Sequence, residues 1–247
     1  AGRASNGATG QRNVAIGFEA LKAFTSGSDN VVIGDEAGKA ISSGESNILI
    51  GTDAGKDIET AKHTVAIGHY AGSERTTIWH LTAVGSQACA YATTAEYPTA
   101  VGYGALNLLT TGNYNTAVGA LALDACTEGA ENVALGYMAL SGVTDGNSNI
   151  AIGKECAKNI QGGDSNIAIG RETLNSCNSG EYNIAIGAGA LALTTCDQNI
   201  GIGKDAGDVI TSGDNNICIG YQADASSATV DNEITLGNSS ITKFRIP

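Results

Sequence analysis

The chain has 247 residues and a formal net charge of −12, with 34 Gly, 2 Pro and 5% aromatic residues. So few large side chains argue against a conventional globular core, and the acidic balance argues against nucleic acid or an anionic membrane surface as a partner. No apolar run approaches the ~20 residues of a membrane span, so we expect no membrane insertion.

Residues 1–12 form the predicted N-terminal lead-in. They contain neither an initiator Met nor a signal-like segment, which indicates a processed chain or a fragment. From residue 13 onward a short motif recurs, in which Asn and an aliphatic stretch are closed by Gly. The closing glycines lie at residues 17, 34, 51, 68, 85, 102, 119, 136, 153, 170, 187, 203, 220 and 237, a period of 17 with one step of 16. A fixed period of this length predicts a solenoid.

The repeats predict a mainly β protein, a parallel β-solenoid (β-roll) of about fourteen 17-residue coils. The repeat solenoid covers residues 13–232, and residues 233–247 form the terminal coil and an exit segment. Its coils are expected to begin near residues 13, 30, 47, 64, 81, 98, 115, 132, 149, 166, 183, 199 and 216. No stretch is left for a separate catalytic domain, so we expect one elongated domain.

Each coil is expected to start with a short strand, numbered here relative to the motif Gly at position 0. Position −3 is Val, Ile or Thr and position −1 is Ile, Val or Leu in all fourteen repeats. Because residues two apart share a face of a strand, positions −3 and −1 are predicted to point into the interior. Position −2, which is Ala in nine repeats, would then form an apolar stripe on the second face.

The rest of the coil has three further recurring positions. Ala at +3, often Leu or Gly at +4, and an apolar residue at +7 have helical spacing, which predicts a helical turn or a tight arc, with a second short strand as the alternative. Gly at +10 predicts a corner with positive φ. Asn at −4 in ten repeats predicts an inward ladder of amide hydrogen bonds between coils. The six cysteines are expected to be small buried hydrophobes.

The thin core of each coil predicts association. The −2 stripe lacks an obvious cover within its own coil, and three chains around a common axis would cover it, so a homotrimer is expected. The alternative is a monomeric solenoid whose +3 to +7 arc folds back over the stripe.

The segments "NTAVGALALDACTEGAEN" and "NIAIGKECAKNIQGGDSN" resemble the NxAIG/NTAVG repeats of bacteriophage tail fibres and of trimeric bacterial adhesin heads. The tail "DNEITLGNSSITKFRIP" is similar to the segment that precedes an endosialidase-type intramolecular chaperone. The resemblance implies a trimeric fibre located in a virion tail or on a cell surface. The period departs from the 14 residues common in adhesin heads, so the coil geometry need not be the same.

The motifs that suggest chemistry have simpler explanations. "GIGKDAG" fits a dinucleotide-binding pattern, but no βαβ unit fits the period. Because the three His and six Cys form no recognisable catalytic or metal-binding set, we expect no enzyme activity, no cofactor and no metal. The acidic column at +2 and the Lys column at +5 of the first coils predict surface ion pairs. A calcium site is the alternative, although the GGxGxD pattern of calcium-binding rolls is missing.

Residues 61–98 depart most from the repeat. These coils lack the corner Gly and concentrate all three His, the single Trp and several Tyr. The +12 column is expected to form an exposed stripe of rings on which a sugar can stack, unless the rings only cap a local bulge. The predicted binding residues are His63, His69, Tyr70, Arg75, Trp79, His80, Tyr91, Tyr97 and Tyr114.

The sequence therefore predicts a structural, cell-attachment segment of a trimeric fibre that presents a binding surface to glycans or a protein receptor on host or prey cells. Two rival functions remain. An ice-binding solenoid would need two Thr columns on one flat face, whereas the Thr pairs near +8 are adjacent in sequence. A tailspike-type glycan depolymerase would need paired carboxylates in a groove.

Overall fold

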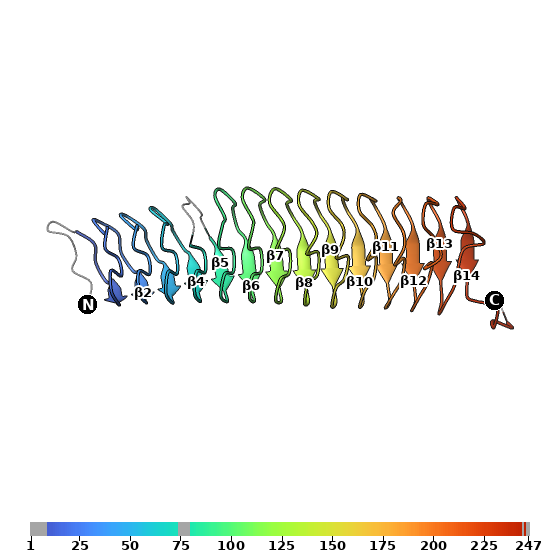
Figure 1. Ribbon diagram of the computed structural model, residues 1–247, viewed down its shortest axis with the longest axis horizontal. Helices are drawn as coiled ribbons and strands as arrows, with labels where there is room; N and C mark the ends of the chain where they lie inside the picture. Colours follow the sequence, from blue (N-terminus) through green and yellow to red (C-terminus); the bar gives the residue numbers. More distant parts are fainter. Residues whose placement is uncertain (1–8, 74–79, 244, 246–247) are drawn as a thin grey trace. The chain divides into compact units, whose positions relative to one another are not determined.

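A computed structural model describes residues 9–73, 80–243 and 245. The chain forms two compact units, Ala1–Asn132 (unit 1) and Val133–Pro247 (unit 2). Each unit is a stack of coils with one three-residue strand per coil, and the described residues contain no helix (Figure 1). The predicted parallel β-solenoid is confirmed. Its fourteen strands delimit about thirteen coils, because too few residues follow the last strand to make another.

The strands stack in chain order within each unit. Unit 1 contains β1 Val14–Ile16, β2 Val31–Ile33, β3 Ile48–Ile50, β4 Val65–Ile67, β5 Thr82–Val84, β6 Thr99–Val101 and β7 Thr116–Val118. Unit 2 contains β8 Val133–Leu135, β9 Ile150–Ile152, β10 Ile167–Ile169, β11 Ile184–Ile186, β12 Ile200–Ile202, β13 Ile217–Ile219 and β14 Ile234–Leu236. Within each unit successive strands pair in parallel, so that equal repeat positions lie side by side.

The two faces of the strands are reversed from the sequence prediction. Position −2 is buried in twelve of the strands, as at Val32, Leu49 and Ala168, whereas positions −3 and −1 are half-buried or exposed throughout. The prediction was wrong because both faces are apolar, and alternation alone does not say which of two apolar faces is enclosed.

A tight arc follows each strand and covers the −2 stripe. Its +3, +4 and +7 side chains are buried, as at Ala105, Leu106 and Leu109. The backbone reverses through successive turns in which +2 and often +4 have positive φ, such as Glu19 at 52° and Leu21 at 53°. Neither the helical turn nor the second strand is present in the described residues. The −2 stripe therefore has its cover within its own coil, and the argument for a trimer that rested on a bare −2 stripe was wrong.

The motif Gly at position 0 is required by close contact between coils. Gly153 has φ +138°, and a Cβ there would lie 2.4 Å from the carbonyl oxygen of Gly170 in the next coil. An L-residue would be both strained and sterically blocked. This explains why the motif ends in Gly in every repeat.

The corner Gly at +10 has a different role from the one expected. Gly27 has positive φ, but Gly44 and Gly163 do not. At Gly163 an added Cβ would lie 2.4 Å from the carbonyl oxygen of Gly180. The corner is thus Gly because coils approach closely there, and the expectation of positive φ holds at Gly27 but not along the column.

The predicted Asn ladder is confirmed. In unit 2 the Nδ2 of Asn166 donates to Oδ1 of Asn149 at 3.0 Å and to the carbonyl of Gly180 at 2.8 Å. The backbone N–H of Asn166 donates to the same Oδ1, and the Asn residues of the ladder in unit 2 are all buried. The amide therefore satisfies backbone groups of two neighbouring coils that water cannot reach.

The six cysteines are free thiols, and all except Cys196 are buried. Burial raises the pKa of Cys89 and of Cys156 to about 12. Protonated, enclosed thiols of this kind are unreactive and act as small apolar side chains, in agreement with the prediction.

Candidate functional site

The predicted +12 stripe of rings forms a continuous stack in unit 1. The ring centroids lie 5.3 Å apart between His63 and His80, 4.9 Å between His80 and Tyr97, and 5.2 Å between Tyr97 and Tyr114. The planes differ by 3° to 9°, and all four side chains are exposed. Stacked coils place one ring above the next because all four ring residues have φ between 56° and 61°, so that their side chains leave the coil in the same direction.

The parallel stacking changes how this ring column can bind a ligand. Rings that stack on one another use their faces internally, so the column presents ring edges to solvent. The exposed groups are the Tyr97 and Tyr114 hydroxyls and the imidazole nitrogens of His63 and His80, which donate and accept hydrogen bonds. A sugar can therefore be bound by hydrogen bonds along the column, because neighbouring rings cover both faces of His80 and Tyr97.

The other predicted site residues lie elsewhere. His69 and Tyr70 meet edge to face, with centroids 4.4 Å apart and planes at 88°. Tyr91 is 48% exposed and lines a hollow with Tyr70. Arg75 and Trp79 lie outside the described residues.

That hollow has a volume of about 360 Å³ and draws its walls from three successive coils. It is lined by Lys56, Asp57, Tyr70, Ser73, Gln87, Ala90 and Tyr91. Sequence reasoning named only the two tyrosines, because the other five residues are unremarkable within the repeat. The volume falls in the range of small-molecule sites.

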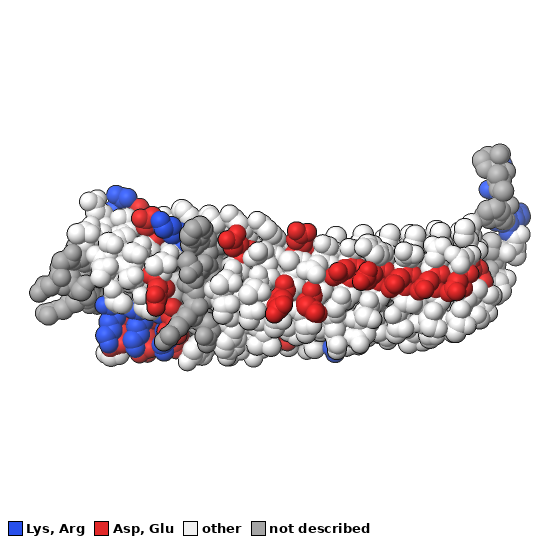
Figure 2. All heavy atoms as spheres, turned by 90° about the horizontal axis from the view of Figure 1, so that it is seen from above, with Lys and Arg blue, Asp and Glu red and all other residues white. Residues whose placement is uncertain are grey.

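The hollow opens where an ion-pair ladder ends. In the first coils Lys39 bridges Glu19 and Glu36 at 2.8 and 2.9 Å, and Lys56 bridges Glu36 and Asp53 at 2.7 and 2.9 Å. These charges gather at the lower left of Figure 2. In the next two coils the +5 column shortens to Ser73 and Ala90, which leaves space beside Lys56.

Within the ion-pair ladder the lysine charges are balanced by neighbouring carboxylates. Hydrogen bonds from Lys39 and Lys56 lower the pKa of Glu36 to about 2, and hydrogen bonds to Glu36 and Asp53 raise the pKa of Lys56. Each lysine is therefore neutralised by carboxylates on its own side of the coil. The predicted surface ion pairs are confirmed in these coils.

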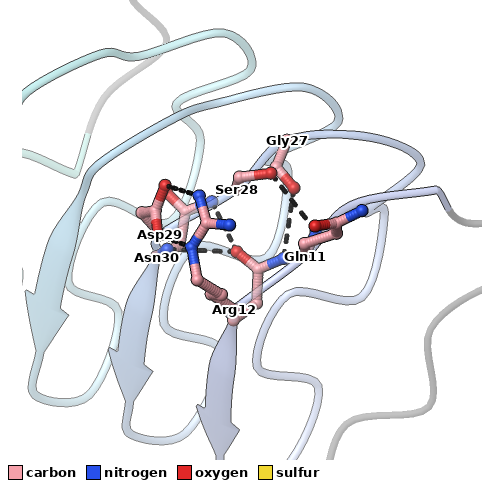
Figure 3. A network of polar contacts seen from close by, with 7 residues as sticks. Gln11, Arg12, Gly27, Ser28, Asp29 and Asn30 are labelled. Carbon is pink, nitrogen blue, oxygen red and sulfur yellow. Dashed lines mark hydrogen bonds and ion pairs between the residues drawn. The ribbon is translucent and has the colours of Figure 1, made fainter.

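The +12 column begins with an ion pair. Arg12 forms a bidentate pair with Asp29, with Nε–Oδ1 and Nη2–Oδ2 distances of 2.6 and 2.8 Å. Figure 3 shows this pair next to Asn30. The N–H of Asn30 donates to Oδ1 of Asn13 at 3.0 Å, which is the first step of the Asn ladder. The +12 column therefore begins with charged side chains and has stacked rings from His63 onward.

In unit 2 an acidic row lies at the position just before the +12 column (Figure 2). The carboxylates of Asp197, Asp214 and Asp231 each accept the backbone N–H of the corresponding residue one coil earlier, at 2.9 to 3.0 Å. These hydrogen bonds therefore link the backbones of neighbouring coils. Among the described residues, no group of three or more His, Cys, Asp or Glu is arranged to hold a metal ion.

The outward strand face is a second candidate surface. Its two columns at −3 and −1 consist of Ile, Val, Leu and Thr, and Ile16, Leu135 and Ile234 are 54%, 46% and 67% exposed. In each unit seven strands at ~4.8 Å spacing make a strip of about 30 Å by 10 Å, or roughly 300 Å². Sequence reasoning had placed this face in the core.

Within the described part of the chain, no helix has the length and hydropathy needed to cross a bilayer. Comparisons of the chain with protein-family models, with curated proteins and with solved structures find no match.

Proposed function

We propose that the protein is a non-catalytic structural and attachment segment of a trimeric fibre. The supporting observation is the outward strand face, two uninterrupted columns of aliphatic and Thr side chains that each unit leaves open to solvent. The fibre belongs to a phage tail or a bacterial surface, as the resemblance of the repeats implies.

Association of copies would cover the strand face. Each unit offers roughly 300 Å² of this strip, and a partner that packs along it would remove these apolar side chains from water. A closed threefold arrangement uses the same strip of each chain once, and it leaves the ring column and the ion-pair ladder free for other contacts.

Light scattering of the purified protein tests the assembly. A mass of three times 24.8 kDa is expected, and Ile186→Lys with Ile202→Lys should reduce it to one chain, because both side chains point outward and contribute little to the core. Leu193→Lys, at an exposed arc position, is the matched control and should leave the mass unchanged. A wild-type mass of 24.8 kDa would contradict the trimer.

Attachment to cells is the second part of the proposal. The ring column and the hollow bring exposed ring edges, ring faces and polar groups together in unit 1, a composition suited to glycans or a protein receptor. Labelled protein should bind host or prey cells without releasing oligosaccharides from their polysaccharide. Release of oligosaccharides would favour a depolymerase instead.

Ice binding is the alternative that the strand face also favours. In β5, β6 and β7 the outward columns read Thr and Val at two-residue spacing, on a regular parallel sheet. Thermal hysteresis of a monomeric protein, abolished by Thr99→Lys, would support this function over the fibre.

A further inference from the structure

We infer that the hollow between Tyr70 and Tyr91 is a subsite for one ring of a neutral sugar, an inference that rests on the proposed attachment function. The departure from the repeat marks its two tyrosines but not the hollow itself. It arises because side chains of three coils differ in length at neighbouring positions, and its walls combine two tyrosines with polar groups.

The dimensions suit a sugar ring. Lys56 and Asp57 lie on one coil and Gln87 and Tyr91 lie two coils further on, so the outer walls are about 10 Å apart at ~4.8 Å per coil. The middle coil contributes Tyr70 and the buried Ser73. A space of about 360 Å³ between these walls accommodates one pyranose with part of its neighbour.

The tyrosines provide the ring faces that the ring column lacks. Tyr70 and Tyr91 are 39% and 48% exposed. Among the described residues, Tyr91 makes no ring contact and Tyr70 meets only His69, at 88° rather than in a parallel stack. An aromatic face that is open to solvent can pack against the apolar face of a sugar.

The polar groups match sugar hydroxyls. Asp57 provides a carboxylate that accepts hydrogen bonds, and the Gln87 amide both donates and accepts. A pair of adjacent hydroxyls, each both donor and acceptor, can satisfy these groups together. The hollow therefore provides directional contacts as well as packing.

The charges select a neutral ligand. Lys56 is neutralised by Glu36 and Asp53, at 2.7 and 2.9 Å, whereas Asp57 takes part in no ion pair of the described residues. The walls thus have an excess of negative charge, which disfavours sialic acids, uronic acids and sulfated sugars.

The test is a glycan array probed with the full chain, followed by saturation-transfer NMR titration with neutral methyl hexopyranosides. Binding to uncharged hexose termini is expected. Tyr91→Ala and Asp57→Asn should each weaken it about tenfold, because one removes a ring face and the other the carboxylate charge. Tyr103→Ala, equally exposed in the same unit, should change nothing. Thermal unfolding and mass of each variant establish that it is folded.

The outcomes separate this inference from the fibre proposal. Unchanged neutral-sugar binding in folded Tyr91→Ala and Asp57→Asn proteins would overturn the subsite, as would preference for anionic sugars. A threefold mass without neutral-sugar binding would overturn the subsite and leave the fibre standing. Neutral-sugar binding lost in Tyr91→Ala but retained in the control would support the subsite, whatever the mass of the protein.

Discussion

The coils of unit 2 from Asn149 to Asn216 and the described residues 64–73 and 80–98 of unit 1 have the same strands and the same pairing between coils but different side chains. In unit 2 the −4 column is Asn in five successive coils, whereas the irregular coils of unit 1 have Thr64, Leu81 and Pro98 there. The backbone bond between coils persists in both, at 2.8 Å for Ile167 N–H to Asn183 and 3.0 Å for Thr82 N–H to Pro98.

Some positions of the coil are the same in both regions, whereas others vary. The motif Gly, the outward −3 and −1 residues and the buried −2 residue are common to both regions. The Asn ladder is dispensable where buried apolar side chains replace it, as Leu81 does. Two of these coils bear His80 and Tyr97 of the ring column and the Tyr70 and Tyr91 walls of the hollow, so variation is concentrated in one part of unit 1.

The largest effect is expected at the shared motif Gly. Gly153→Ala in unit 2 and Gly68→Ala in unit 1 should each cost about 4 kcal/mol or more, because a Cβ would lie 2.4 or 2.5 Å from the next coil's carbonyl at strongly positive φ. Denaturant unfolding measures the cost. Gly162→Ala, where the nearest atom is a side-chain oxygen 3.2 Å away, is the control and should change little. Tolerance of Ala at Gly68 alone would show that the irregular coils are looser.

The second-largest effect on stability is expected for substitutions at position −4. Asn183→Leu should cost about 3 to 5 kcal/mol, because the buried N–H of Asn199 and the carbonyl of Cys196 lose their partner. Asn178→Leu at an exposed position of the same unit is the control.

The reverse change, Leu81→Asn, should cost about as much as Asn183→Leu, because it replaces a fully buried apolar side chain with an amide. The new amide can donate to the Ala95 carbonyl by the geometry that joins Asn47 to Ala61. Its Oδ1 would still lack the donor that other ladder residues have, because the next coil has Pro98 at this position and proline has no N–H. Unfolding in denaturant compares the two variants. A cost less than half that of Asn183→Leu would mean that this coil accepts an amide in place of Leu81.

Acidification should weaken the first coils of unit 1. The pKa of Glu36 is lowered from 4.5 to about 2, so the carboxylate stabilises the folded state above pH 4.5, and this contribution is lost as the pH falls toward 2. Melting temperatures at neutral pH and near pH 3 should differ more in the wild type than in Glu36→Gln. An equal fall in melting temperature in both proteins would mean that the ion-pair ladder contributes nothing measurable to stability.

The smallest effect is expected at Asp208 in unit 2, where loss of the carboxylate charge should stabilise the fold. Burial raises the pKa of Asp208, and the neighbouring Asp224 carboxylate raises it further. A raised folded-state pKa means that ionised Asp208 destabilises the fold near neutral pH and that protonation relieves this as the pH falls. Asp208→Asn should therefore raise the melting temperature slightly at neutral pH. A fall in melting temperature would show that the carboxylate has a stabilising partner.

The sequence by itself determined the period, the place of every strand, the Asn ladder and the order of the rings at +12. These follow from one-dimensional spacing, since equal positions of successive coils must lie side by side once the coils stack. Only the tertiary structure decided which strand face is enclosed, because −2 and the −3/−1 pair are both apolar and the choice depends on how the arc folds back. The hollow likewise depends on tertiary structure. Its walls at Asp57, Tyr70 and Gln87 come from three coils, and their side-chain lengths, rather than any repeat, leave the space open.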